Sequence, residues 1–107
     1  MSNSEIYYIF GRLTPDLEIP SHLTQQQAVD LYQARWDALQ PLCRDVEAMG
    51  FTSHHYTPSS ARFLMRAALT DDQRKQLGEN PRVERILTSH EYYVEFVEPL
   101  NTSRMVA

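Results

Sequence analysis

The sequence predicts a single α+β domain built on an antiparallel sheet, and three observations support this prediction. Apolar residues make up 42% and charged residues 22% of the 107 residues, which is ordinary for a folded globular chain. A chain of this length can form one core without disulfides or metals. Its hydrophobic pattern switches twice between a period of two and a period of 3.6, as it does when strands alternate with helices.

The N-terminal half predicts a strand, a loop and a long helix. Residues 6–10 are a continuous apolar run rich in aromatic and β-branched side chains, which favours a buried strand. Residues 11–21 contain two prolines and are expected to form a loop. A T-x-x-Q capping box at Thr24 then begins a helix that we expect to bend at Pro41 and to end at Gly50. Its apolar stripe consists of Ala28, Leu31, Tyr32, Trp36, Leu39, Leu42, Cys43, Val46 and Met49.

The C-terminal half predicts two strands, a short helix and a last strand. Residues 51–57 and 62–69 are expected to be strands joined by a turn at residues 58–60. Thr70 and Gln73 form a second T-x-x-Q capping box, and Gly78 is expected to end that helix in a left-handed conformation. Residues 83–88 predict the fourth strand. The strand-forming residues that follow it predict an extra strand or extended segment near Tyr92 to Phe96.

The expected order is strand, helix, strand, strand, helix, strand. Two βαβ units joined by a hairpin form a split βαβ, ferredoxin-like sandwich, in which two helices cover one face of a four-stranded antiparallel sheet. We expect residues 1–97 to form this domain and residues 98–107 to form a flexible C-terminal tail.

The residue types that usually carry chemistry form no standard catalytic or metal-binding pattern. His54 and His55 are adjacent on an expected strand, so they point to opposite faces. Cys43 lies on the apolar stripe, where a buried and inert thiol is expected. The sequence has no zinc-ligand spacing, no nucleophile elbow and no glycine-rich phosphate loop. We therefore expect no enzyme activity, no metal and no cofactor.

Charge and composition also narrow the class of partner. The formal net charge is −4 and no basic run occurs, which argues against nucleic acid. The single cysteine cannot form an internal disulfide. The apolar run at residues 6–10 is too short for a signal peptide or a membrane span, so we expect a cytoplasmic protein that does not enter membranes.

Paired tyrosines are the best candidates for a binding surface. They occur at residues 7–8 and 92–93, on the first and last expected strands, so one tyrosine of each pair would face the helices and the other would face outward. The outward set, with a histidine of residues 54–55 and with Arg66, could form an amphipathic patch for protein recognition. Aromatic residues also suit strands in general, which leaves a purely structural role open.

Residues 69–86, read as LTDDQRKQLGENPRVERI, resemble the last helix and strand of the subtilisin propeptide-like peptidase inhibitors. In that family Leu-Thr-x-x-Gln, a Leu four residues on, and Asn/Asp-Pro-x-Val recur. The resemblance implies a ferredoxin-like, non-enzymatic inhibitor or chaperone-like partner of a subtilisin-type serine protease. It implies that the open sheet face docks on the protease and that residues after the last strand enter its cleft. The expected partner-binding residues are His54, Arg66, His90, Glu91, Tyr92 and Tyr93.

The chain departs from that family pattern in ways that keep other functions open. Arg74 stands where the family has an apolar helix residue, Pro41 interrupts the long helix, and the chain continues past Glu95, which could make it a substrate instead of an inhibitor. The alternative is a dimeric ferredoxin-like α+β barrel that acts as an adaptor or binds a small molecule. Its homodimer would bury the sheet faces, and its pocket would be lined by His54, His55, Tyr56 and Arg66. A structural or regulatory subunit is the third option.

Overall fold

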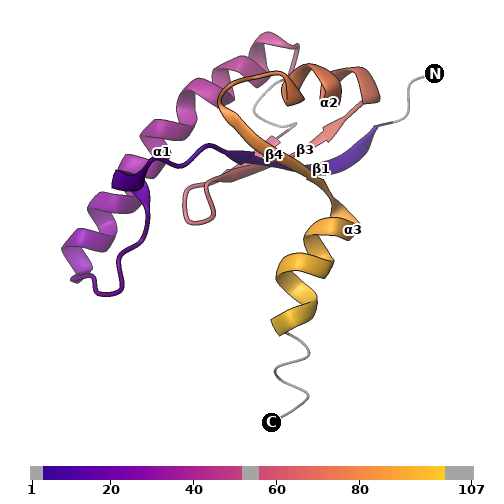
Figure 1. Ribbon diagram of the computed structural model, residues 1–107. Helices are drawn as coiled ribbons and strands as arrows, with labels where there is room; N and C mark the ends of the chain where they lie inside the picture. Colours follow the sequence, from indigo (N-terminus) through magenta and orange to yellow (C-terminus); the bar gives the residue numbers. More distant parts are fainter. Residues whose placement is uncertain (1–3, 52–55, 101–107) are drawn as a thin grey trace.

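The computed structural model describes residues 4–51 and 56–100 of the chain. Its elements, shown in Figure 1, are β1 (Glu5–Gly11), the short 3-10 turn η1 (Pro15–Leu17), α1 (Gln25–Ala48), β2 (Tyr56–Ser59), β3 (Leu64–Leu69), α2 (Asp71–Gly78) and β4 (Val83–Thr88). A helix over residues 89–100 follows, made of α3 (Ser89–Tyr92), the π-helical segment η2 (Tyr93–Val97) and helical residues 98–100. We call it the C-terminal helix.

The four strands form one antiparallel sheet in the order β2-β3-β1-β4. The central strand β1 pairs Tyr7 with Ala67 of β3 on one side and with Thr88 of β4 on the other. Each of the helices α1 and α2 connects two strands that have one other strand between them. The predicted α+β class and the four-stranded antiparallel sheet are confirmed.

The main core lies between the sheet and the helices α1 and α2. Alternation along β1 directs Tyr7 and Ile9 to this face and Tyr8 and Phe10 to the other. Side chains of both helices pack on the first face, together with inward residues of β3 and β4: Leu39, Leu42, Cys43, Val46, Leu77, Met65, Ala67, Leu69 and Val83. Leu39, Leu42 and Val46 of the predicted apolar stripe are therefore fully buried, whereas Ile86 of β4 is only partly buried.

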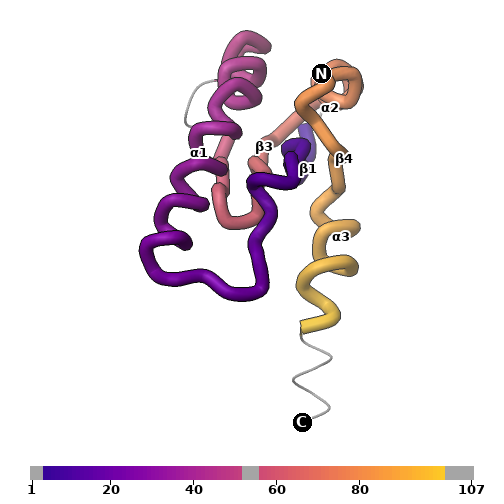
Figure 2. Tube along the Cα trace, turned by 60° about the vertical axis from the view of Figure 1, so that its left-hand side comes forward, coloured from indigo at the N-terminus to yellow at the C-terminus, as the bar shows by residue number. Residues whose placement is uncertain are grey.

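The long helix packs on the sheet through its second half only. Thr24 and Gln27 form the predicted capping box, and Gly50 follows the helix with a φ of 102°, which favours glycine. The buried residues of α1 begin at Arg35, whereas Tyr32 and Trp36 of the predicted apolar stripe are exposed. The reason is visible in Figures 1 and 2, where the first turns of α1 extend beyond the sheet.

The hairpin between β2 and β3 differs from the sequence prediction at its edges. Residues 52–55 lie outside the described part of the chain, and β2 covers Tyr56–Ser59. Pro58, expected in the turn, is part of this strand, which is tolerated because β2 is an edge strand. Before β3, Phe63 has a φ of 52° and its ring packs over Gly11, where a Cβ atom would lie 2.6 Å from the ring.

The C-terminal segment is helical, so the prediction of an extra strand near Tyr92 to Phe96 is corrected. Thr88 and Glu91 form a third capping box directly at the end of β4. The helix then lies on the sheet face opposite α1 (Figure 2). Residues 98–100, expected in a flexible tail, continue this helix, and residues 101–107 lie outside the described residues. The short helix α2 ends at Gly78, which does not adopt the expected left-handed conformation.

Candidate functional site

Four aromatic rings meet where the C-terminal helix lies on the sheet, and we call them the aromatic cluster: Tyr8, Phe10, Tyr92 and Phe96. The rings of Tyr8 and Tyr92 are parallel with centroids 3.8 Å apart. Phe96 stacks on Phe10 at 5.6 Å and lies 5.0 Å from Tyr92. Leu64 and Leu87 are buried beneath these rings. The site is therefore an apolar sheet surface covered by two aromatic side chains of one helix.

The local structure of β1 and of the C-terminal helix explains why these four rings lie together. Tyr8 and Phe10 are two residues apart on β1 and so share a face of the sheet. In the π-helical segment each turn is wider than in an α-helix, so residues four and five apart lie on one side. Tyr92 and Phe96 consequently both stack on the sheet, and Val97 belongs to the same apolar cluster.

Two arginines lie at the border of the aromatic cluster. The guanidinium of Arg85 is 4.7 Å from the centroid of Phe10 and 5.6 Å from that of Phe96, and it pairs with Glu95 at 2.9 and 3.0 Å. Arg62 lies 5.8 Å from the Tyr92 centroid and donates a hydrogen bond to the Tyr92 hydroxyl. A cation over an aromatic face adds an attraction beyond burial. The apolar surface is thus flanked by positive charge.

The structure separates the partner-binding residues predicted from sequence. Tyr92 is buried against the sheet, whereas Tyr93 is 45% exposed and His90 and Glu91 are exposed on the same helix. Arg66 is exposed on β3, on the face of the aromatic cluster, because it pairs in register with Tyr8. His54 lies outside the described residues. Tyr56 and Arg66 lie on opposite faces of the sheet, so the pocket predicted for a dimeric barrel does not bring these two together.

The sequence reasoning missed the contributions of Phe10, Arg62, Arg85 and Phe96. One signal could have found them. Thr88 and Glu91 have the T-x-x-E spacing of a capping box, which predicts a helix start. With that helix, Tyr92 and Phe96 would share one face, and the outward side chains of the sheet would be their only large apolar partner among the predicted elements.

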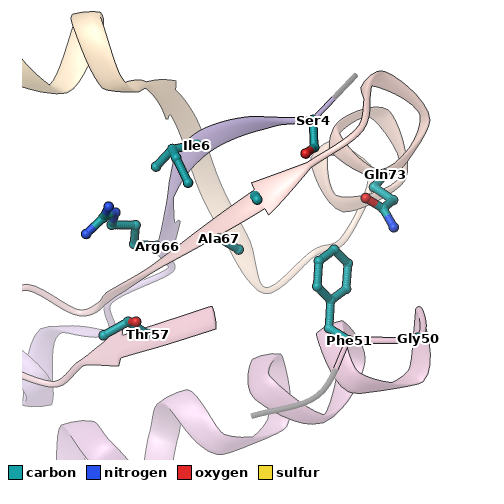
Figure 3. Close-up of a pocket in the computed structure, with 9 residues that line it drawn as sticks. Ser4, Ile6, Gly50, Phe51, Thr57, Arg66, Ala67 and Gln73 are labelled. Atoms are coloured by element: carbon teal, nitrogen blue, oxygen red, sulfur yellow. The ribbon is translucent and has the colours of Figure 1, made fainter. Parts of the chain in front are cut away.

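An open hollow of about 590 Å³ lies at the end of the sheet where β1 begins (Figure 3). Arg66 is the only charged side chain in its lining among the described residues. Gln73 also lines it, but its side-chain oxygen already accepts the backbone N–H of Thr70 in the capping box of α2. The described residues of its lining therefore include no acid–base pair.

A second hollow, of about 630 Å³, lies between α1 and the loop after β1. Its charged side chains already have partners. Arg12 donates to two carbonyl oxygens of residues 81–83, each at 3.0 Å, and pairs with Glu84 at 2.8 Å. Arg82 pairs with Asp45 at 2.9 Å. These contacts tie the segment before β4 to β1 and α1, which is a structural role.

Arg35 is 4% exposed and holds three parts of the chain together. Its guanidinium donates to the carbonyl oxygens of Leu17 and Ala61, each at 2.7 Å. A buried charge needs such hydrogen bonds to remain in the interior. This side chain therefore joins the first loop, α1 and the β2–β3 turn, and no sequence signal indicated it.

Several ionisable groups among the described residues have altered pKa values, each with a local structural cause. The hydrogen bond that the Tyr56 hydroxyl donates to Glu47 raises the pKa of Tyr56 to about 12. Burial raises the pKa of the Cys43 thiol, which keeps it protonated and unreactive. The backbone N–H of Thr88 stabilises the Glu91 carboxylate and lowers its pKa. Each shift reflects a cap, a packing contact or burial.

Within residues 4–51 and 56–100, no three His, Cys, Asp or Glu side chains are grouped so that they could hold a metal ion. In the same part of the chain, no helix is both long and apolar enough to cross a membrane. Comparisons with family models, with curated proteins and with solved structures found no match. The resemblance of residues 69–86 to the propeptide-like inhibitors therefore stays an expectation.

Proposed function

We propose that this chain is a non-enzymatic domain that binds another protein through the sheet face opposite α1 and α2. The observation that carries the proposal is the aromatic cluster with Arg62 and Arg85 at its border. Tyrosine, phenylalanine and arginine are enriched at protein interfaces, because they bury a large area with few rotatable bonds. The main core on the other face is aliphatic by comparison.

Part of this face remains accessible beside the C-terminal helix. Thr57 and Arg66 are paired neighbours on β2 and β3, and both are exposed. Arg66 also pairs with Tyr8 of the aromatic cluster. An incoming protein would therefore meet an arginine first and the aromatic rings next to it.

A subtilisin-type serine protease is the partner class that we propose to test first, with the chain as an inhibitor or chaperone-like partner. Two observations support it. The motif in residues 69–86 folds into a capped helix followed by a strand, as in the propeptide-like inhibitors. The strand order and the two helical crossovers also agree with the ferredoxin-like arrangement that we propose for the fold. Insertion of residues after β4 into a protease cleft would require the C-terminal helix to unwind.

The test is inhibition of a panel of purified subtilisin-type proteases by the full-length chain at micromolar concentration, with a trypsin-type protease as a specificity control. We expect inhibition of a subtilisin-type enzyme only. Arg66→Glu should weaken it about tenfold, or about 1.4 kcal/mol, because Arg66 lies on the proposed face. Arg44→Glu is the matched control, since Arg44 is an exposed arginine of α1 on the opposite side of the sheet.

Two results would contradict the proposal. One is a chain that inhibits none of the proteases, which would remove the assignment of a subtilisin-type partner. The other is equal weakening by Arg66→Glu and Arg44→Glu, which would indicate a charge effect without a defined face. A sedimentation measurement on the same sample reports the mass in solution, and a tight dimer without inhibition would favour the α+β barrel instead.

A further inference from the structure

We infer that the sheet surface beneath the C-terminal helix is a seat for an acidic amphipathic helix, and that the chain's own helix occupies it until a partner helix of similar pattern replaces it. The seat consists of Tyr8, Phe10, Leu64 and Leu87. The inference rests on the proposed function, because it names the partner chemistry of the same sheet face.

Within the described residues, the backbone of the C-terminal helix is connected to the domain through β4 alone, and its other links are side-chain contacts. β4 ends at Thr88, and Thr88 is itself the N-cap of the helix. Thr88 Oγ1 accepts the Glu91 N–H at 3.1 Å, and Glu91 accepts the Thr88 N–H at 2.9 Å. Figures 1 and 2 show that the C-terminal helix projects from the sheet beyond this junction. A change of backbone angles near Thr88 would therefore move the whole helix.

The contact between helix and sheet is small. Tyr92, at 9% exposed, is the one buried residue of this helix among residues 89–100, whereas Tyr93 is 45% and Leu100 58% exposed. Segments with few buried contacts open at a lower free energy than the whole domain. The π-helical residues are Tyr, Val, Glu, Phe and Val, and most of these types prefer strands over helices. The helix therefore depends on the seat for its stability.

The apolar side chains of the seat are in turn shielded from water by the C-terminal helix. Opening the helix would expose two aromatic and two leucine side chains in the middle of a sheet face. Contiguous apolar surface of this kind is unfavourable in water and is characteristic of interaction sites. An opened chain would therefore bind another apolar helix face with a gain in free energy.

The resident helix shows which partner chemistry fits. Tyr92 and Phe96 present two aromatic rings four residues apart, and Glu95 places a carboxylate against Arg85. Arg62 receives the polar end of the first aromatic residue, since it donates to the Tyr92 hydroxyl. A partner helix should thus have aromatic residues at positions i and i+4 and an acid at i+3. This is recognition of an amphipathic helix in a groove.

The test uses a fluorescent peptide of residues 88–100 as the probe and the full-length chain as the receptor. Two variants loosen the resident helix: Thr88→Ala removes its cap and leaves the seat intact, and the double variant Tyr92→Ala with Phe96→Ala removes its two anchors. Thr88→Ala should bind the peptide about fivefold more tightly than wild type and the double variant at least about tenfold, because a larger fraction of molecules is open. The double variant Tyr93→Ala with Val94→Ala alters exposed residues of the same helix and should bind as wild type does.

Amide hydrogen exchange on the same proteins reports whether the helix opens by itself. In the wild type, amides of residues 92–100 should exchange at least about tenfold faster than those of β1. In both loosened variants β1 should stay protected, which shows that the domain is still folded. A peptide with both aromatic residues replaced by alanine should not bind.

Equal peptide affinity for wild type and both loosened variants would overturn the inference, as would exchange of the helix at the rate of β1. The outcome is independent of the protease test. Peptide binding without inhibition of any subtilisin-type enzyme would support the seat and remove only the protease assignment. Inhibition with no peptide binding by any variant would overturn the seat and leave the protein-binding function standing.

Discussion

The two faces of this sheet differ in what they bury. Beneath α1 and α2 the contacts are mostly aliphatic, with Ile9, Met65 and Val46 fully buried. Where the C-terminal helix contacts the sheet, the buried residues of the described chain are Leu64, Leu87 and Tyr92, and partly exposed aromatic rings and arginines surround them. Close-packed aliphatic side chains resist opening, whereas partly exposed aromatic rings can be replaced by aromatic rings of a partner protein. The first face holds the fold together, and the second is suited to recognition.

Removing one leucine from the aliphatic face tests this comparison most strongly. Leu39→Ala and Leu77→Ala should each lower the free energy of unfolding by about 2–5 kcal/mol, because both leucines are fully buried and a cavity would remain. Chemical denaturation measures the loss. A change within about 0.5 kcal/mol, typical of surface substitutions, would show that these helix faces do not carry the core.

Removing Tyr92 from the other face should cost less. Although its ring is stacked on Tyr8, we expect Tyr92→Ala to lower the free energy of global unfolding by only about 1–2 kcal/mol. The cost cannot exceed the free energy that holds the helix on the sheet. A loss as large as that of Leu39→Ala would make the two faces equivalent and contradict the comparison.

The capping boxes allow the same substitution on each face. Thr70→Ala should lower the free energy of unfolding by about 1 kcal/mol, because α2 is part of the main core and loses an N-terminal hydrogen bond. Thr88→Ala makes the same chemical change in the C-terminal helix. It should accelerate amide exchange in residues 92–100 and leave the exchange of β1 unchanged. Acceleration in both segments by Thr88→Ala would indicate one cooperative unit.

The two faces should also respond at opposite ends of the pH scale, with the smallest effects. Because the folded pKa of Tyr56 is raised to about 12, its contribution is complete below pH 10 and is lost as the pH rises toward 12. Because the folded pKa of Glu91 is lowered, the cap contributes above pH 4.5 and is lost as the pH falls through the lowered value. Glu47→Gln should remove the alkaline slope in the stability profile, and Glu91→Gln the acidic one. A slope that persists in its variant would assign it to another group.

Patterns between near neighbours in the chain were sufficient to predict much of this protein. The capping boxes at Thr24 and Thr70 join residues three apart, and β4 was predicted with its observed bounds. The buried stripe positions Leu39, Leu42 and Val46 also followed from spacing alone. Such features depend on local hydrogen bonds and on hydrophobic periodicity, and both are determined by residues that are close together in the sequence.

Tertiary structure decided the rest, and the C-terminal helix shows why. Residues 92–97 have the composition of a strand, yet they are helical because a capped helix brings Tyr92 and Phe96 together onto Tyr8 and Phe10. Burial of these rings outweighs local preference, which is weak for a short segment. Two other features also depend on residues far apart in the chain. Arg35 donates to carbonyl oxygens of two distant loops, and Arg66 lies beside Tyr8 on the same face of the sheet. Local spacing carries no information on such contacts, because only the folded domain places these residues next to one another.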